Sequence, residues 1–212
     1  MALRSIIFDL DGTLIDSAPS ILNSLQIALS EASVTPIQPL SQNLIGPPLP
    51  QIIAEVIVKE QQSSIPDIIA RFKKQYDTIG YRSAFVYPGI QDMLEQLKQK
   101  DFDLYIATNK RIAPTRNILN HLGWQSFFKE VYALDYFEPA VPDKSTMLSR
   151  IVDTLKQDAN RLVYVGDRSE DFEAAKLNQI PFLWATWGYE KSTKEKDVTS
   201  VLESPNELFL IL

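Results

Sequence analysis

Two carboxylates, a glycine and a hydroxyl directly follow a short apolar run near the start of the chain, where residues 5–14 read SIIFDLDGTL. Asp9 and Asp11 stand two residues apart, so their charges repel each other, and partial burial adds the cost of removing them from water. A chain keeps such a pair mainly where a divalent cation or a reacting group compensates. The alternative is a polar turn after a buried strand, with Asp11-Gly12 as the turn dipeptide. This segment alone leaves both interpretations open.

The cysteine and histidine content excludes several kinds of chemistry. The chain has no Cys, which excludes disulfides, thiolate metal sites and cysteine nucleophiles. Its single histidine, His121, excludes multi-histidine zinc sites, and we expect it to contact a helix dipole instead. Hydrolytic chemistry must therefore use carboxylates, hydroxyls, lysines and a hard cation. Mg²⁺ fits, because its preferred ligands are oxygen atoms.

Length and composition are those of an ordinary globular protein. The 212 residues suffice for one substantial core with a small inserted domain, and 45% of them are hydrophobic. The net charge of -6 and the lack of a basic tract argue against nucleic-acid binding. No apolar stretch is long enough to span a bilayer, and residues 1–4 run into the first predicted strand without a signal peptide. We expect a cytoplasmic protein with no membrane partner.

Short apolar runs separated by helical patterns predict an α/β protein with a doubly wound parallel sheet. A last short helix is expected to start at a capping box over residues 204–207. The predicted strands are Ser5–Phe8, Phe102–Ala107, Glu130–Ala133, Arg161–Val165 and Phe182–Ala185.

The segment from residue 17 to residue 82 interrupts this alternation. It carries three consecutive helical stripes and no obvious strand, with a Pro-rich loop over residues 35–50. We interpret it as a small helical cap inserted into a core formed by residues 1–16 and 83–212. The alternative is that these helices pack directly on the sheet.

Polar residues follow the predicted strands where their carboxyl ends must meet, which is where doubly wound sheets bind ligands. Each is weak evidence alone, because an N-cap, a solvated lysine or a turn would explain it. These residues are Asp9, Asp11, Thr108, Asn109, Lys110, Lys144, Asp167 and Asp171.

Their order along the chain resembles a known family. Residues 9–14 (DLDGTL) look like the first signature of the haloacid dehalogenase-like hydrolase superfamily, and residues 166–171 (GDRSED) match its fourth. Thr108 and Lys144 stand at the positions of the second and third signatures. The helical segment resembles the small cap of the phosphoglycolate phosphatase-like branch, as do residues 87–90 (YPGI) and 187–189 (WGY). The chain is identified on these motifs as a member of that superfamily, with its Rossmann-like core.

The resemblance implies an Mg²⁺-dependent phosphatase that acts on a small phosphorylated metabolite. Asp9 would attack phosphorus to form an aspartyl phosphate, and Asp11 would protonate the leaving oxygen and later activate water. The metal would be held by the Asp9 carboxylate, the Asp11 backbone carbonyl and Asp167. Asp171 would be either a ligand through water or a carboxylate that orients the others. Asp11 argues against dehalogenation, because a departing halide needs no proton.

The resemblance also suggests contacts to the substrate. Thr108 and Lys144 would hold the phosphoryl oxygens, and Asn109 would line the same pocket or cap the next helix. In the cap, Gly46 and Pro47 look like the substrate loop of the family, although a rigid connector is the equal alternative. The remaining candidate is Arg82, at the cap–core junction, where a hinge role is as plausible as a substrate contact.

Other functions stay open at this point. The scaffold also suits a sugar phosphomutase, a nucleotidase or a pyrophosphatase, although Thr13 favours the phosphatase pattern over the mutase pattern. A non-catalytic regulatory protein would have lost a motif carboxylate, and none is lost here. Ser145 replaces the usual Pro and Asn178-Gln179 replaces a common Ala-Gly pair, which leaves the substrate open. We expect a monomer or a homodimer.

Overall fold

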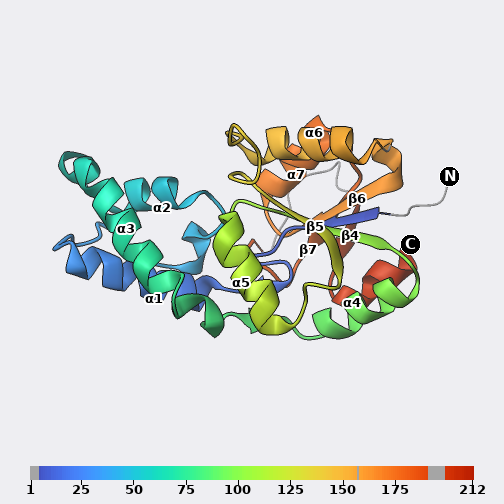
Figure 1. The fold of residues 1–212 in the computed structure, drawn as a ribbon, viewed down its shortest axis with the longest axis horizontal. Coiled ribbons are helices and arrows are strands. Elements are labelled where there is room, and N and C mark those ends of the chain that lie inside the picture. Colours follow the sequence, from blue (N-terminus) through green and yellow to red (C-terminus); the bar gives the residue numbers. More distant parts are fainter. Residues whose placement is uncertain (1–4, 157, 191–198) are drawn as a thin grey trace.

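A six-stranded parallel sheet lies between two layers of helices in one half of the molecule (Figure 1), in a computed structural model that describes residues 5–156, 158–190 and 199–212. The strand order is β5-β4-β1-β6-β7-β8. The apolar residues of β1 are buried on both faces, as a central parallel strand requires. The strands are β1 (Ser5–Phe8), β4 (Asp103–Thr108), β5 (Phe128–Ala133), β6 (Leu162–Gly166), β7 (Phe182–Ala185) and β8 (Ser200–Leu202).

Helices cover both faces of this sheet. Successive side chains of a strand point to opposite faces, so each strand has apolar side chains to bury on both sides. Ile6 and Phe8 pack in one apolar cluster with α4 (Ile90–Gln99), α5 (Ile112–Leu122) and η5 (Pro205–Leu210). Ile7 packs in a second cluster with α6 (Lys144–Leu155) and α7 (Ser169–Leu177). The predicted doubly wound α/β fold is confirmed.

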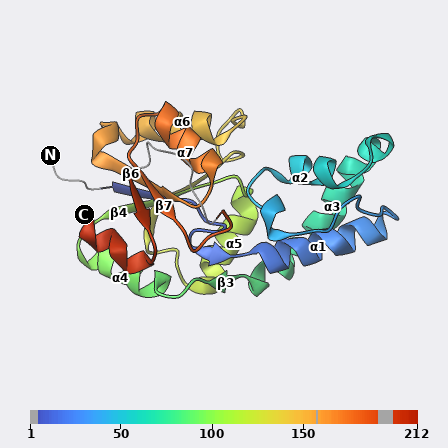
Figure 2. The same ribbon diagram turned by 180° about the vertical axis from the view of Figure 1, so that it is seen from behind.

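A helical unit with its own apolar cluster lies beside the sheet, on the side away from the C-terminus (Figures 1 and 2). The two-stranded pair of β2 (Ile15–Asp16) and β3 (Phe85–Val86) lies where the chain enters and leaves it. The domain boundaries after residues 16 and 82 remain a prediction. The unit contains α1 (Ala18–Glu31), η1 (Gln42–Leu44), α2 (Leu49–Val56), η2 (Lys59–Ser64), α3 (Ile65–Tyr76) and η3 (Gly80–Ser83).

Two details differ from the sequence-based expectations. The predicted capping box at Ser204 is wrong, because the Ser204 side chain makes no cap hydrogen bond. The short helix that follows, residues 205–210, is a 3₁₀ helix. The Ser204 hydroxyl instead lies 3.3 Å from the Glu207 carboxylate. Strand β8 and the β2–β3 pair were not expected.

Residues 1–4, on which the expectation of no signal peptide rests, lie outside the described residues. None of the helices within the described ranges combines the length and apolarity needed to cross a membrane.

Candidate active site

The register of the central strands brings the motif residues to one edge of the sheet. Phe8 pairs with Ile106 of β4 and with Val165 of β6, so the residues that follow these three emerge side by side. The backbone N–H of Asp9 continues this ladder, donating to the Val165 carbonyl at 2.8 Å. Asp9 therefore lies next to the Gly166-Asp167 turn, although more than 150 residues separate them in sequence.

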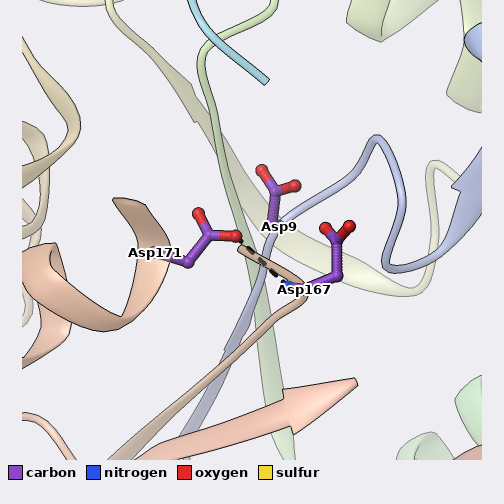
Figure 3. A group of neighbouring side chains, drawn as sticks. All are labelled: Asp9, Asp167 and Asp171. Carbon is purple, nitrogen blue, oxygen red and sulfur yellow. Dashed lines mark hydrogen bonds between the residues drawn. The ribbon is translucent and has the colours of Figure 1, made fainter. Parts of the chain in front are cut away.

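Three buried carboxylates share this edge (Figure 3). Oxygen atoms of Asp9, Asp167 and Asp171 all lie within 4.8 Å of one another, and Figure 3 shows the three side chains gathered around one space. Burial raises the pKa of Asp9 well above its usual range. The pKa of Asp167 is raised to about 7, mainly by burial and secondly by the nearby charge of Asp171. The group therefore resists carrying three negative charges unless a positive charge joins it.

Lys144 provides part of that positive charge. It is the first residue of α6, whose N-cap Asp143 accepts a hydrogen bond from the Thr146 N–H at 2.7 Å. Its Nζ donates to Oδ1 of Asp9 at 2.9 Å and also to Oδ1 of Asp171. Burial opposes its charge, but the carboxylates of Asp171 and Asp9 raise the pKa of Lys144 above its ordinary value. Lys144 thus remains an ammonium group between two acids.

Asp171 is held by hydrogen bonds on both oxygens. The Tyr164 hydroxyl and Lys144 donate to Oδ1, and the backbone N–H groups of Asp167 and Arg168 donate to Oδ2, each at 3.2 Å. An oxygen pair with four donors has little capacity left for a direct metal bond. This favours the second of the two expected roles for Asp171, a carboxylate that orients its neighbours.

Asp11 lies apart from the three-carboxylate group and has different partners. The Ser17 hydroxyl donates to its Oδ1, and the ammonium of Lys110 lies 3.1 Å from its Oδ2. Lys110 also donates to the Tyr76 hydroxyl of α3 at 3.1 Å. The Asp11 side chain is therefore placed between the strand ends and the helical unit, where an acid would meet a leaving group.

The other predicted site residues lie in three places. Thr108 is buried at the end of β4, where its Oγ1 accepts from the Lys110 N–H at 3.2 Å. Asn109 does not cap α5; its Nδ2 donates to the Gly46 carbonyl at 3.0 Å, so this side chain joins the sheet edge to the loop of Gly46 and Pro47. Arg82 is exposed in η3 and contacts the Tyr81 ring, away from the cavity between the helical unit and the sheet, so its assignment to the substrate is not supported.

Three residues of the site were not assigned from sequence. The backbone N–H of Tyr189 donates to Asp167 at 2.7 Å, and its hydroxyl accepts from the N–H of Ser17 at 2.9 Å. Tyr164 supports Asp171 from the middle of β6. Ser17 and Tyr189 lie near or within noted segments, the domain crossing and the WGY stretch, but no spacing rule links either to an acid. The only signal for Tyr164 is a hydroxyl inside an apolar strand.

Glycine is needed at position 12 because any side chain there would overlap the Asp167 side chain. The φ of Gly12 is +94°, and a Cβ at this position would lie 2.3 Å from Oδ2 of Asp167. Gly123 is a matched comparison, since its φ is +71° and a Cβ there would meet nothing within 4 Å. The backbone cost of a side chain is thus similar at both positions, and the clash with Asp167 is specific to Gly12.

We predict different outcomes for Gly12→Ala and Gly123→Ala. Gly123→Ala should lower the free energy of unfolding by roughly 1–2 kcal/mol, the cost of a left-handed backbone for alanine, and Gly12→Ala by more because of the added clash. Only Gly12→Ala should also displace Asp167, with loss of Mg²⁺ binding measured by calorimetry at pH 8. Equal Mg²⁺ affinity in the two variants would show that Asp167 takes no part in holding the metal.

The residues present fit a divalent cation. Four carboxylates (Asp9, Asp11, Asp167 and Asp171) face two ammonium groups (Lys110 and Lys144), which leaves two negative charges when all are ionised. The donors are oxygen atoms, which Mg²⁺ prefers. The pKa values of Asp9 and Asp167 are raised because both carboxylates are buried close to other acids, and a bound cation would offset this cost.

Comparisons with known proteins identify relatives of the chain in sequence and in fold. Residues 6–185 match the family model described as haloacid dehalogenase-like hydrolase. The chain is 31% identical over 188 residues to tyrosine-protein kinase PtkA of Mycobacterium tuberculosis, covering 88% of this chain but only 63% of the relative. It is 30% identical over 191 residues to phosphoglycolate phosphatase of Xanthomonas campestris, covering 88% of this chain and 84% of the relative. A solved haloacid dehalogenase-like hydrolase from Streptococcus pneumoniae superimposes with a TM-score of 0.85 at 26% identity, covering 99% of this chain and 98% of that one.

Proposed function

Because this chain belongs to the haloacid dehalogenase-like hydrolase family, we propose that it is an Mg²⁺-dependent phosphatase that hydrolyses a phosphomonoester through an aspartyl phosphate on Asp9. The observation that supports the proposal is that Asp9 and Asp11 have different surroundings, each suited to a different step. Asp9 is buried beside Lys144 and the carboxylates of Asp167 and Asp171. Asp11 faces the other way, towards the cavity under the helical unit.

The first step is attack by Asp9 on phosphorus. Lys144 holds Oδ1 of Asp9 at 2.9 Å, which leaves the second carboxylate oxygen to form the bond to phosphorus. Asp11 gives its proton to the departing oxygen, and the resulting carboxylate then takes a proton from the water that hydrolyses the intermediate. Thr108 and Lys144 stabilise the charge on the phosphoryl oxygens as it shifts towards the leaving group.

Mg²⁺ would be held by the carboxylates of Asp9 and Asp167 and by the backbone carbonyl of Asp11. When bound, it supplies positive charge that stabilises the transferring phosphoryl group. Asp171 fixes Lys144 and the Asp167 backbone in place through its hydrogen bonds. This arrangement gives every motif acid a distinct task.

Several substrates suit this site. The name of the Xanthomonas relative makes phosphoglycolate the first small metabolite to test. Nucleotides, sugar phosphates and pyrophosphate are the alternatives, together with a phosphomutase that returns the phosphoryl group to a sugar. The cytoplasmic location and the monomeric or homodimeric state expected from the sequence stay predictions.

The direct test is a panel of phosphate esters assayed with Mg²⁺ and with EDTA. Hydrolysis should be measurable for at least one ester class, and EDTA should lower the rate at least about 10²-fold, because the metal supplies several kcal/mol of transition-state stabilisation. Added Mg²⁺ should restore the rate. Hydrolysis that survives EDTA, or none across the panel, would contradict the proposal.

A further inference from the structure

A cavity of about 310 Å³ lies between the helical unit and the carboxyl ends of the strands. Asp11 is among its lining residues, together with residues of α2, α3 and the loop over residues 45–50. The leaving group must reach Asp11 to receive its proton, so this cavity is where the leaving group lies. Its volume is at the lower end of the range for small-molecule sites, about 300–1,000 Å³.

The cavity is apolar over most of its lining. The helical unit supplies Ile21, Ile52, Ile69 and Phe72, and the α/β part adds Pro114 and Leu134. The rings of Phe72 and Tyr76 stack with their centroids 5.2 Å apart and their planes 13° from parallel. These two residues sit on adjacent turns of α3, so two stacked aromatic rings form part of the lining.

Two of the three lysine and arginine side chains that line the cavity lie beside carboxylates. Lys110 lies 3.1 Å from the Asp11 carboxylate, and Arg111 lies 2.6 Å from the Asp77 carboxylate. The remaining lining cation, Lys73, is exposed. A small leaving group that carries its own carboxylate, such as glycolate, would therefore find mostly apolar walls. It would also fill little of the volume.

From the volume and the apolar lining, we infer that the substrate is a phosphomonoester of a ring-sized apolar alcohol. The inference rests on the proposed function, since it names the class of leaving group that Asp11 protonates. The ring of the alcohol packs among Ile52, Ile69 and Phe72, and the phosphoryl group extends towards Asp9. Specificity then comes from burial of the ring and not from an ion pair.

The kinetic test compares benzyl phosphate with ethyl phosphate and phosphoglycolate, all with Mg²⁺. Benzyl and ethyl esters are both alkyl esters of similar leaving-group basicity, so their ratio reports on the ring. We expect kcat/KM for benzyl phosphate to exceed that for ethyl phosphate by roughly 50-fold, which burial of one phenyl ring supplies. An equal or higher value for ethyl phosphate or phosphoglycolate overturns the inference.

A filled cavity should remove this preference. Ile69 lines the cavity from α3, so Ile69→Trp should reduce the benzyl-to-ethyl ratio to below about 5-fold by occupying the space for the ring. Ala70→Trp is the matched control, because Ala70 is the next residue of the same helix and is exposed outside the cavity. It should keep the wild-type ratio. An unchanged ratio in Ile69→Trp overturns the inference.

A binding measurement separates this inference from the proposed function. Benzylphosphonate and ethylphosphonate cannot be hydrolysed, and calorimetry should show the benzyl compound binding at least about 10-fold more tightly in wild-type protein and Ala70→Trp only. Tighter binding without hydrolysis of any ester would support the cavity assignment and contradict the phosphatase. Hydrolysis without either preference would support the phosphatase and contradict the cavity assignment.

Discussion

Asp9→Asn is expected to abolish turnover while the protein stays folded. The amide keeps the shape of the carboxylate but cannot form the bond to phosphorus, so we expect a loss of roughly 10⁴-fold or more in kcat. The loss should be seen with every ester that the wild-type protein hydrolyses, since all must pass through the same nucleophile. Steady-state assays with Mg²⁺ measure it.

The folded state should tolerate this change because a charged Asp9 is already costly without a metal. Burial raises its pKa well above the usual range, so a neutral amide replaces a group that resists ionisation. In EDTA the unfolding midpoint should therefore stay within about 4 °C of wild type, a shift that corresponds to about 1 kcal/mol in a chain of this size.

Asp143→Asn is the matched control for the same chemical change. Asp143 precedes Lys144 but caps α6, a task that asparagine performs equally well. It should keep wild-type activity and stability. Comparable activity in Asp9→Asn and Asp143→Asn would exclude covalent catalysis by Asp9.

The grouping of the main site residues could be predicted because the patterns that identify strands and helix starts are local in the sequence. Asp9 and Asp167 each follow an apolar run long enough to identify as a strand, and parallel strands must bring their carboxyl ends to one edge. The positions of Lys144 and Asp171 at helix starts follow from the same alternation. These residues could therefore be grouped without knowing any distance.

The contacts that the sequence did not predict depend on packing between elements. Lys110 reaches Tyr76, and Asn109 reaches the Gly46 carbonyl, only because the helical unit lies over the strand ends. No periodicity encodes that contact. The two roles left open for Arg82 could not be separated for the same reason, since its position in the chain did not reveal that it is exposed against Tyr81.

The missed strands lack the pattern that identifies the others. Strand β8 has three residues, and its central Val201 is 46% exposed, so it gives neither an apolar run nor a clear alternation. The β2–β3 pair has two residues on each side. Its formation depends on the antiparallel approach of two distant chain segments, which residue spacing does not show.

Asp11→Asn is expected to lower kcat/KM by an amount that depends on the leaving group. For alkyl esters the departing oxygen needs a proton, and we expect a loss of roughly 10³-fold. For p-nitrophenyl phosphate the departing phenolate is stable without one, so Asp9 should still be phosphorylated at a rate close to wild type. Hydrolysis of that intermediate should remain slow, because the variant has no carboxylate to take a proton from water.

Asp16→Asn controls for the loss of one acid near the same turn. Asp16 accepts from the Ala18 N–H at 3.1 Å, a bond that an asparagine oxygen also accepts, so the variant should keep wild-type rates.

These two different demands on one carboxylate give Asp11→Asn a distinctive time course. Rapid mixing with p-nitrophenyl phosphate should show a burst of p-nitrophenolate equal to the enzyme concentration, followed by slow turnover. The burst follows if Asp11 activates the water that hydrolyses the aspartyl phosphate, and the larger loss of kcat/KM for alkyl esters reports its separate role as the acid. A purely structural role would slow all esters by one factor and give no burst. Since Asp11 contacts Ser17 and Lys110 and not the three-carboxylate group, its removal leaves Asp9, Lys144 and Asp167 in place to form the intermediate.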